Sequence, residues 1–469
     1  MSDLSLLPEG WAIETIGNLI LSSNTGLVRG VNDQSSDKEF SYFKMNNLST
    51  KGKFELTNLV KVDATNEELL KYSLQAGDFI FNTRNSVELV GKCGVLEHEP
   101  SEPVIFNNNL LRITFRHINP RIISFWFNSA DGKSQLRSVT SATTSVAAIY
   151  QKALIALEVP IPPLAEQKVI TDKLDELLTQ VESTKARLDA IPAILKSFRQ
   201  SVLAAAVSGE LTEEWRGENS KLNVWKSNFN PLKIEQQSEP FDLPSLWSWE
   251  HLGHTVTIHN NLRKPIKQSD RDKRPGQYPY YGAFGVIDDF DDFVFDGIYI
   301  LLAEDGKNLE VRSRPISLIA KGKFWVNNHA HVLKPREGIL FSYINYFLNS
   351  PVALIDQFLT GQDQVKLNRK AMELIPISVP PIEEQAEIVR RIEELFAFAD
   401  KVEAQVNAAQ LRVNNLTQSI LAKAFRGELT AEWRTANPEL ISGDNSASAL
   451  LKCIKSERTK LKPTKKTKA

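Results

Sequence analysis

The chain has 469 residues, of which 42% are hydrophobic and 24% are charged, close to the usage of ordinary globular proteins. These values exclude a disordered or collagen-like chain, and the length predicts about three domains. Its two cysteines, Cys93 and Cys453, lie far apart in sequence, so we expect neither a disulfide framework nor a cysteine-based zinc site. We find no signal-like N-terminus and no uninterrupted apolar run of about 18 residues, and therefore expect a cytoplasmic protein.

The net charge of −1 conceals a strongly basic C-terminal segment. Residues 452–469 contain eight Lys or Arg and one Glu, a charge of +7, so residues 1–451 carry −1 − 7 = −8. The basic tail could contact DNA or a partner, or remain a solvated terminus. An acidic body is not expected to hold nucleic acid alone over a broad surface. A nucleic-acid role would therefore need local basic loops or a basic partner.

Short strands and long helices alternate along the chain. In the first block we expect a short helix at 66–73 and strands at 78–81 and 90–96. A long helix should follow from about 164 to 206. In the second block we expect strands at 293–295 and 297–302 and a short helix at 341–349, before a second long helix. These elements predict the following domains: strand-rich domain 1–163, long helix 164–216, linker 217–242, strand-rich domain 243–381, long helix 382–434 and basic tail 435–469.

A tandem repeat organises the whole chain. Residues 162–216 align with 380–434 without a gap, and 21 of the 55 aligned positions are identical. A weaker repeat of Leu-Pro, Trp, Glu and Gly precedes each copy, beginning at Leu7 and Leu243. The intervening blocks differ in length and content. We therefore expect the repeated modules to do one job twice, and the variable blocks to do related jobs on different targets.

Each repeated module has the hydrophobic spacing of a coiled coil. Ten apolar or small positions at alternating steps of four and three run from Ile170 to Val202, and ten more from Ile388 to Ile420. Pro192 lies inside the first helix and predicts a kink. A continuous helix over 164–206 would be roughly 63 Å long at 1.5 Å per residue. We expect the two helices to pair antiparallel and separate the two blocks; the alternative is that each packs on its own block.

The fold class predicted in this way is α+β. It consists of two mixed, strand-rich domains, separated by two long antiparallel coiled-coil helices in a pseudo-two-fold tandem repeat. The sequence lacks the phosphate-binding loop, the dinucleotide fingerprint and the Asn/Asp-Pro-Pro-aromatic motif of amino-methyltransferases. The closely spaced histidine pairs, His251 with His254 and His329 with His331, have no obvious third ligand, so we expect no metal site. We therefore predict a protein that is not an enzyme.

This organisation closely resembles the DNA specificity subunits of Type I restriction-modification systems, and in particular their enteric branch. The residues that carry the resemblance are 161–167 (IPPLAEQ), 379–385 (VPPIEEQ), 414–430 (NNLTQSILAKAFRGELT) and 7–11 (LPEGW). Within the second block, 278–283 and 361–368 are similar to segments of such recognition domains. The resemblance covers nearly the whole chain.

The resemblance implies a non-catalytic reader of double-stranded DNA. Each recognition domain would read one half of a split target sequence, and the helices would set the gap between the halves. Two methyltransferase subunits would bind the chain, and two motor-nuclease subunits would join them in a restriction complex. The chain itself would bind no cofactor, because S-adenosylmethionine, ATP and Mg²⁺ belong to those partners.

Candidate DNA-contacting residues follow from the chemistry of base recognition. Arg and Lys suit guanine, Asn and Gln suit adenine, and hydroxyl groups suit phosphates. For each residue the alternative is an ordinary turn, a solvated side chain or, for the tyrosine, a place in the core. The candidates are Lys44, Asn46, Asn47, Asn82, Arg84, Asn85, Thr143, Thr144, Arg263, Lys264, Tyr281, Lys321, Lys323, Gln362, Gln364 and Lys366.

Two other functions compete with DNA recognition. A structural adaptor with two protein-binding domains on a coiled-coil rod would have the same repeat. A single-chain restriction-modification enzyme would need the phosphate-loop and methyltransferase motifs that the sequence lacks.

Overall fold

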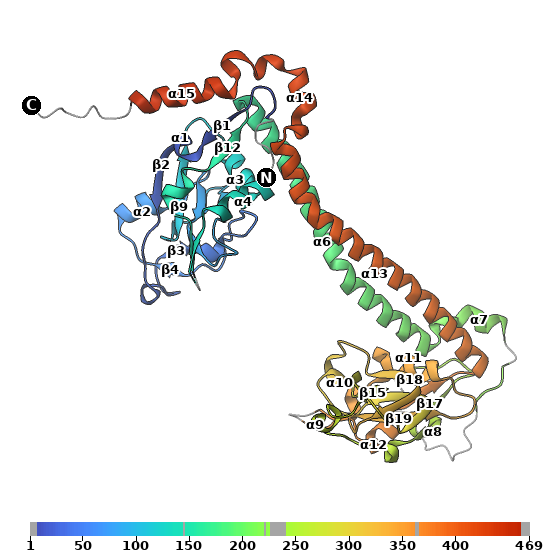
Figure 1. The fold of residues 1–469 in the computed structure, drawn as a ribbon. Coiled ribbons are helices and arrows are strands. Elements are labelled where there is room, and N and C mark those ends of the chain that lie inside the picture. Colours follow the sequence, from blue (N-terminus) through green and yellow to red (C-terminus); the bar gives the residue numbers. More distant parts are fainter. Residues whose placement is uncertain (1–6, 144–145, 220–221, 226–240, 362–364, 461–469) are drawn as a thin grey trace, which may run out of the picture. The chain divides into compact units, whose positions relative to one another are not determined.

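A computed structural model describes residues 7–143, 146–219, 222–225, 241–361 and 365–460 (Figure 1). The chain divides into two compact units, Met1–Arg187 with Ala409–Ala469 and Leu188–Ala408. Each of the two long helices is shared between the units, so that each unit contains one strand-rich domain and two helix segments. The prediction of an α+β tandem repeat is confirmed.

The strands of the first unit form four small sheets. One sheet has the order β2-β9-β5-β7 and another the order β4-β3-β8, while β10-β11-β6 and β1-β12 are smaller. The strands are β1 (Ala12–Thr15), β2 (Ile20–Thr25), β3 (Phe40–Phe43), β4 (Lys61–Val62), β5 (Phe79–Asn82), β6 (Arg84–Asn85), β7 (Cys93–Val95), β8 (Val104–Phe106), β9 (Leu110–Phe115), β10 (Ser141–Ala142), β11 (Ala147–Ala148) and β12 (Glu158–Ile161).

Short helices complete this domain and cover its core. They are α1 (Ile16–Leu19), α2 (Asn66–Tyr72), α3 (Pro120–Asn128), α4 (Ala130–Ser138) and α5 (Gln151–Leu154). The amphipathic α3 begins with Asn119 as N-cap and Pro120 in its first turn, and it buries Trp126 in the domain core. The Trp126 ring meets Phe425 edge-on at 5.1 Å between centroids. One apolar core therefore joins the domain to the helix that carries Phe425.

The second unit has a six-stranded sheet of order β14-β19-β17-β18-β15-β16 and a separate β13-β20 pair. Its strands are β13 (Ser248–His251), β14 (Val256–Ile258), β15 (Pro275–Gly282), β16 (Gly285–Phe290), β17 (Phe295–Ala303), β18 (Ser317–Val326), β19 (Ala330–Pro335) and β20 (Pro376–Val379). Its short helices are α7 (Glu213–Glu218), α8 (Leu252–Thr255), α9 (Gln268–Arg271), α10 (Asn308–Val311), α11 (Phe341–Asn349) and α12 (Arg369–Glu373).

The two domains share one topology although their sequences differ. The order β2-β9-β5-β7 has its counterpart in β14-β19-β17-β18. A parallel pair follows the same pattern, with Tyr42 opposite Ile105 in one domain and Tyr280 opposite Trp325 in the other. The backbone N–H of Ile149 donates to Thr83, and that of Leu367 donates to Glu304. Since Ile149 and Leu367 are 218 positions apart, the repeat extends structurally into the variable blocks.

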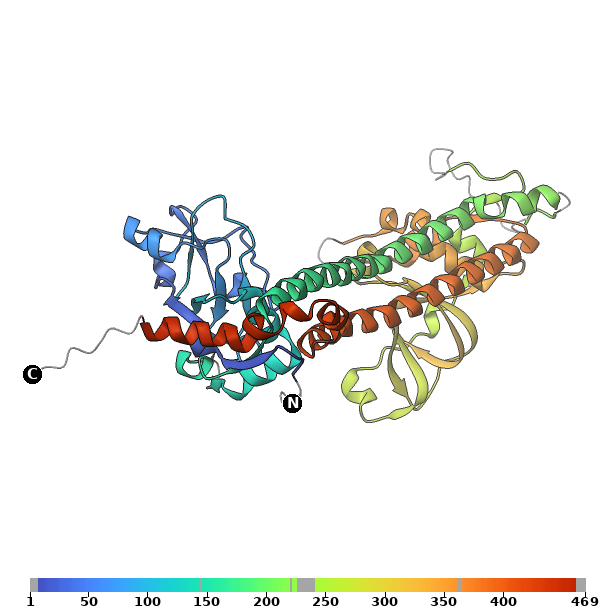
Figure 2. The ribbon, with the colours of Figure 1, turned by 90° about the horizontal axis from the view of Figure 1, so that it is seen from above.

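The long helices α6 (Leu164–Ser208) and α13 (Ile382–Phe425) run antiparallel within each unit (Figure 2). In the first unit Lys185 donates to Asn414 at 3.0 Å. In the second unit Arg199 binds Asp400 at 2.7 Å and Glu403 at 2.8 Å. Residue numbers therefore increase along one helix as those of its contacts on the other helix decrease. The predicted antiparallel pairing is confirmed, and the helix assignment of α6 continues through Pro192.

By length and hydropathy alone, α6 could cross a membrane. It is the only helix in the described ranges of which this is true. Some of its apolar side chains lie in two protein cores, whereas Leu164 and Ile194 are exposed. Ile170 and Leu174 are buried in the first unit, and Val202, Leu203 and Ala206 in the second. Length and composition alone are therefore weak evidence that α6 spans a membrane.

The C-terminal part of the chain returns to the first domain. After α14 (Ala431–Ala436), helix α15 (Ala447–Lys460) buries Leu451 and Ile454 in the core that contains Ile16. Figures 1 and 2 both show α15 beside this domain. Within the segment predicted as a basic tail, 435–469, the 14 residues of α15 therefore form a packed helix rather than a solvated terminus; residues 461–469 lie outside the described ranges.

Several local predictions agree with the structure and two do not. The helices predicted at 66–73 and 341–349 correspond to α2 and α11. The strand predicted at 90–96 shrinks to β7, because Val90–Lys92 belong to a turn in which Gly91 adopts a positive φ of 87°. The strand predicted at 293–295 is wrong for Phe293 and Val294, which connect β16 to β17.

Candidate nucleic-acid interface

A fully buried carboxylate lies at the first turn of α6. Glu166 accepts hydrogen bonds from Trp11 Nε1 at 2.8 Å, Thr430 Oγ1 at 2.5 Å and Arg434 at 2.6 Å. These donors come from the start of the chain and from the segment after α13. We call this four-residue cluster the first clamp. A buried carboxylate costs much desolvation free energy unless it is paired and hydrogen-bonded, and here it is both.

The second unit contains the same cluster. Glu384, also fully buried, accepts from Trp247 Nε1 at 2.9 Å, Thr212 Oγ1 at 2.7 Å and Arg216 at 2.5 Å. We call it the second clamp. Each clamp combines Trp and Glu from one half of the sequence with Thr and Arg from the other half. The sequence repeat identified all of these positions. Only the structure shows that the Thr and Arg of each half bind the Glu of the other half.

The residue after each glutamate connects the helix to the recognition domain. Gln167 accepts from the backbone N–H of Asn119, which caps α3, at 2.9 Å. Gln385 accepts from the N–H of Leu340, which precedes α11, also at 2.9 Å. Both glutamines are buried. The clamps and glutamines therefore fix each domain on its helix pair, and they leave the loops to carry recognition.

Four predicted DNA-contacting residues of the first domain lie close together. Arg84 and Asn85 form β6, which pairs with β11 of the hairpin whose first strand leads to Thr143. Arg84 and Thr143 are exposed. Asn82 is fully buried, and its amide donates to the carbonyls of Arg84 at 2.9 Å and Asn109 at 3.1 Å. The structure thus gives Asn82 a supporting role instead of the predicted base contact, because its polar atoms serve the backbone.

The other predicted loop of this domain follows β3. Asn46 is exposed, while the Asn47 side chain accepts from the backbone N–H of Lys44 at 3.0 Å. The Lys92 ammonium group supports this loop by donating hydrogen bonds to the backbone carbonyls of Met45 at 2.6 Å and Leu48 at 2.5 Å. Burial lowers the pKa of the Lys92 ammonium group. Lys92 was absent from our sequence-based candidates, because a lysine in a turn has no signal for such a supporting role.

The predicted residues of the second domain are more scattered. Lys321 and Lys323 are exposed on β18, and Lys323 lies over the Phe293 ring at 4.5 Å. Lys264 and Lys366 are exposed on other segments. Thr144, Gln362 and Gln364 lie outside the described residues.

Two predicted residues of the second domain have structural partners. Arg263 donates to Glu304 at 2.5 Å and to the carbonyl of Ala330 at 2.8 Å, and its side chain is 13% exposed. Tyr281 packs edge-on against Phe324 at 5.5 Å, and burial raises the pKa of its phenol. Both residues therefore have structural contacts within the domain, and DNA contact by them stays a prediction.

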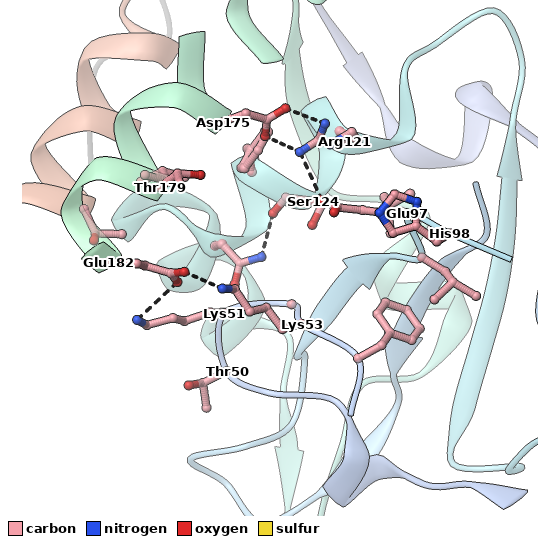
Figure 3. Close-up of a pocket in the computed structure, with 18 of the residues that line it drawn as sticks. Thr50, Lys51, Lys53, Glu97, His98, Arg121, Ser124, Asp175, Thr179 and Glu182 are labelled. Carbon is pink, nitrogen blue, oxygen red and sulfur yellow. Dashed lines mark hydrogen bonds and ion pairs between the residues drawn. The ribbon is translucent and has the colours of Figure 1, made fainter. Parts of the chain in front are cut away.

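A cavity of about 640 Å³ lies between the first domain and the helices of the same unit (Figure 3). Arg121 of α3 and Asp175 of α6 form an ion pair at one side, with a contact at 2.6 Å. Lys51 and Lys53 pair with Glu182 of α6 at another side. Burial raises the pKa of Glu182, but the bonds from the lysines outweigh it and leave the pKa below its usual value. Carboxylates offset the cations, so the cavity is not a dedicated anion site.

Among the described residues, no group of three or more His, Cys, Asp or Glu is arranged to hold a metal ion. The molecule is thus defined by two similar recognition domains, each fixed by a clamp to a shared helix pair. This is the class of two-domain sequence readers built on a helical spacer.

Comparison with known proteins identifies the family. The family model described as "Type I restriction modification DNA specificity domain" matches residues 8–193 and 244–409. The chain belongs to the family of DNA specificity subunits of Type I restriction-modification systems.

Individual relatives agree with this assignment. The chain is 36% identical to the Type I restriction enzyme EcoKI specificity subunit of Escherichia coli K12, and 96% of each chain is covered. It is 33% identical to the StySPI specificity subunit of Salmonella potsdam, again over 96% of each chain. A crystal structure of the HsdS subunit from Thermoanaerobacter tengcongensis has the same fold, with a TM-score of 0.54, 17% identity and coverage of 90% of this chain and 98% of that one.

Proposed function

We propose that this chain is a non-catalytic specificity subunit in which each recognition domain reads one half of a bipartite DNA target. The observation that carries the proposal is the pair of equivalent clamps, which hold two domains of one topology but different surface chemistry. One domain repeated unchanged would read the same sequence twice. Two different surfaces on one scaffold suit a target with two unlike halves.

The partners and cofactors follow from this role. Two methyltransferase subunits bind the chain and supply S-adenosylmethionine chemistry, and restriction subunits that use ATP and Mg²⁺ join them. The chain itself binds no cofactor and acts in the cytoplasm. Partner subunits can also supply the phosphate contacts that dominate DNA affinity, which suits the charge of −8 over residues 1–451.

Co-expression with the methyltransferase subunit in a host free of DNA methylation tests the proposal. Genome-wide mapping of modified adenines should give a two-part motif with a fixed gap. Replacing residues 18–155 with the corresponding block of another specificity subunit should change one half of the motif only. A stable complex that methylates no site would contradict the proposal and favour the structural adaptor.

The spacing role needs a separate test. Insertion of four residues within 170–202 adds about 6 Å of helix. We expect the gap of the methylated motif to change or methylation to disappear. An unchanged gap with full methylation would exclude the helices as the ruler.

A further inference from the structure

One position is equivalent in the two recognition domains and differs in chemistry. In the first domain the chain leaves the central strand β5 and forms β6, where Arg84 pairs with Ala148. In the second domain the chain leaves the corresponding strand β17, and Asp305 forms a bridge with Lys366. The bonds from Ile149 to Thr83 at 3.0 Å and from Leu367 to Glu304 at 2.7 Å establish the equivalence.

The backbone around Arg84 is rigidly supported. The buried amide of Asn82 binds the carbonyl of Arg84 and accepts from Asn85 Nδ2 at 2.9 Å. The hydroxyl of Thr83 donates to the carbonyl of Asn109 at 3.0 Å. The backbone that carries Arg84 is therefore held in place before the side chain meets a ligand, which reduces part of the entropic cost of binding.

The Arg84 side chain itself is exposed, and no residue in the described ranges binds its guanidinium group. The other arginine among our candidates, Arg263, is largely buried and binds Glu304 and backbone carbonyls. Two exposed apolar side chains, Val87 at 58% and Val146 at 50%, flank the same small sheet. In the major groove, a free guanidinium group can bind the acceptor edge of guanine, and the neighbouring apolar side chains can contact the methyl group of thymine.

The second domain offers a different group at this place. The Asp305 carboxylate binds Nδ1 of His329 at 2.7 Å, and the backbone N–H of His329 donates to Asn327 at 2.8 Å. The His329 side chain is 46% exposed. Since Nδ1 is occupied by Asp305, the ring presents Nε2 outward. At the equivalent position the first domain therefore carries an exposed arginine, whereas the second carries an aspartate bound to His329 of the turn between β18 and β19.

We propose that Arg84 reads a guanine in one half-site, and that His329, which is bound through Nδ1 by Asp305 at the position equivalent to Arg84, reads a base in the other. This inference rests on the proposed function and adds residues to it. It requires that the half-site read by the first domain contain at least one G·C pair. If that half-site contains only A·T pairs, the inference is wrong.

The experiment uses the full chain co-expressed with the methyltransferase subunit, and its readout is the sequence motif of methylated sites. In Arg84→Gln we expect discrimination at one guanine position to fall by on the order of 10- to 100-fold. The other half-site and the gap should stay unchanged. In His329→Ala only the half-site read by the second domain should relax, so each variant serves as the internal control of the other.

Two further variants separate base reading from charge. Arg137→Gln removes an exposed arginine of the same domain, on α4, and should leave the motif unchanged. Arg84→Lys keeps the charge but loses the two-pronged contact, so it should relax the same guanine position. If Arg84→Gln weakens all sites equally and Arg84→Lys restores them, Arg84 contacts phosphate and the inference is wrong. If the wild-type chain yields no bipartite motif, the proposed function itself fails.

Discussion

The two units have the same clamp but attach their domains to the helices differently. In the first unit, Arg121 of α3 forms an ion pair with Asp175 of α6 across the edge of a cavity. In the second unit, α11 occupies the place of α3, and its Tyr346 meets Phe396 of α13 edge-on at 6.0 Å. The positions equivalent to Arg121 and Asp175 are Ser342 and Glu393, and an uncharged serine cannot form this ion pair.

This difference distinguishes contacts that are the same in both units from contacts that vary between them. The Trp-Glu-Thr-Arg clamp has identical residues in both units, and its hydrogen bonds agree within a few tenths of an ångström. The contact beside it is ionic and about one-third exposed in one unit and aromatic in the other. The clamp therefore determines where a domain is attached, whereas the neighbouring contact adjusts how firmly the attachment holds.

The largest effect should come from breaking a clamp. Glu166→Ala leaves the Trp11, Thr430 and Arg434 donors unpaired, and we expect it to lower the free energy of unfolding by about 3–5 kcal/mol. Glu384→Ala should cost the same in the second unit, because its bonds are equivalent. Chemical denaturation of both variants measures this.

The control for the clamp is Glu182→Ala, which removes a partly exposed glutamate on α6 and should cost less than about 1 kcal/mol. A cost for Glu384→Ala much smaller than for Glu166→Ala would show that the two clamps, despite equal geometry, are not equivalent in energy.

The aromatic contact of the second unit should have the next largest effect. A double-mutant cycle with Tyr346→Ala and Phe396→Ala should give a coupling free energy of about 0.5–1.5 kcal/mol. Because the contact is apolar, the coupling should not change between low and high salt. Phe125 and Leu178, the sequence-matched pair of the first unit, form the control cycle, and we expect weaker coupling there since both line the cavity.

Much of this architecture could be predicted from the sequence, since it depends on local periodicity and on repetition. The helices, their antiparallel pairing and the special positions Glu166 and Trp11 all followed from repeated residues. The common topology of the domains could not be predicted, because strand pairing joins residues such as Thr83 and Ile149 that have no sequence signal linking them. The structural roles of Asn82 and Arg263 were missed for the same reason, since their partners are distant in sequence.

The role of α15 distinguishes the first unit further. Glu14, which is 8% exposed, accepts from Asn18 at 2.8 Å and from Lys455 of α15 at 2.7 Å. Burial raises the pKa of Glu14, but these hydrogen bonds outweigh it and leave the pKa below the ordinary 4.5. The stabilisation is therefore present above the unfolded-state pKa and is lost as the pH falls through the folded-state pKa.

Glu14→Gln should accordingly cost about 1 kcal/mol at pH 7. The cost should shrink below pH 4.5, where the wild-type carboxyl group also becomes protonated. Unfolding measured between pH 3 and 7 tests the sign, and hydrogen exchange of α15 locates the effect. A cost that grows on acidification would contradict the ionic role of Glu14.

The smallest effect should distinguish the two units most clearly. A double-mutant cycle with Arg121→Ala and Asp175→Ala should give a coupling of about 0.2–1 kcal/mol at low salt, because both side chains are about one-third exposed. Since ions screen exposed charges, the coupling should approach zero near 1 M salt, where the Debye length is about 3 Å. The Tyr346–Phe396 coupling measured under the same conditions is the reference. If both couplings respond equally to salt, the attachments do not differ in kind; if only the first weakens, ionic strength selectively loosens the first recognition domain on its helices.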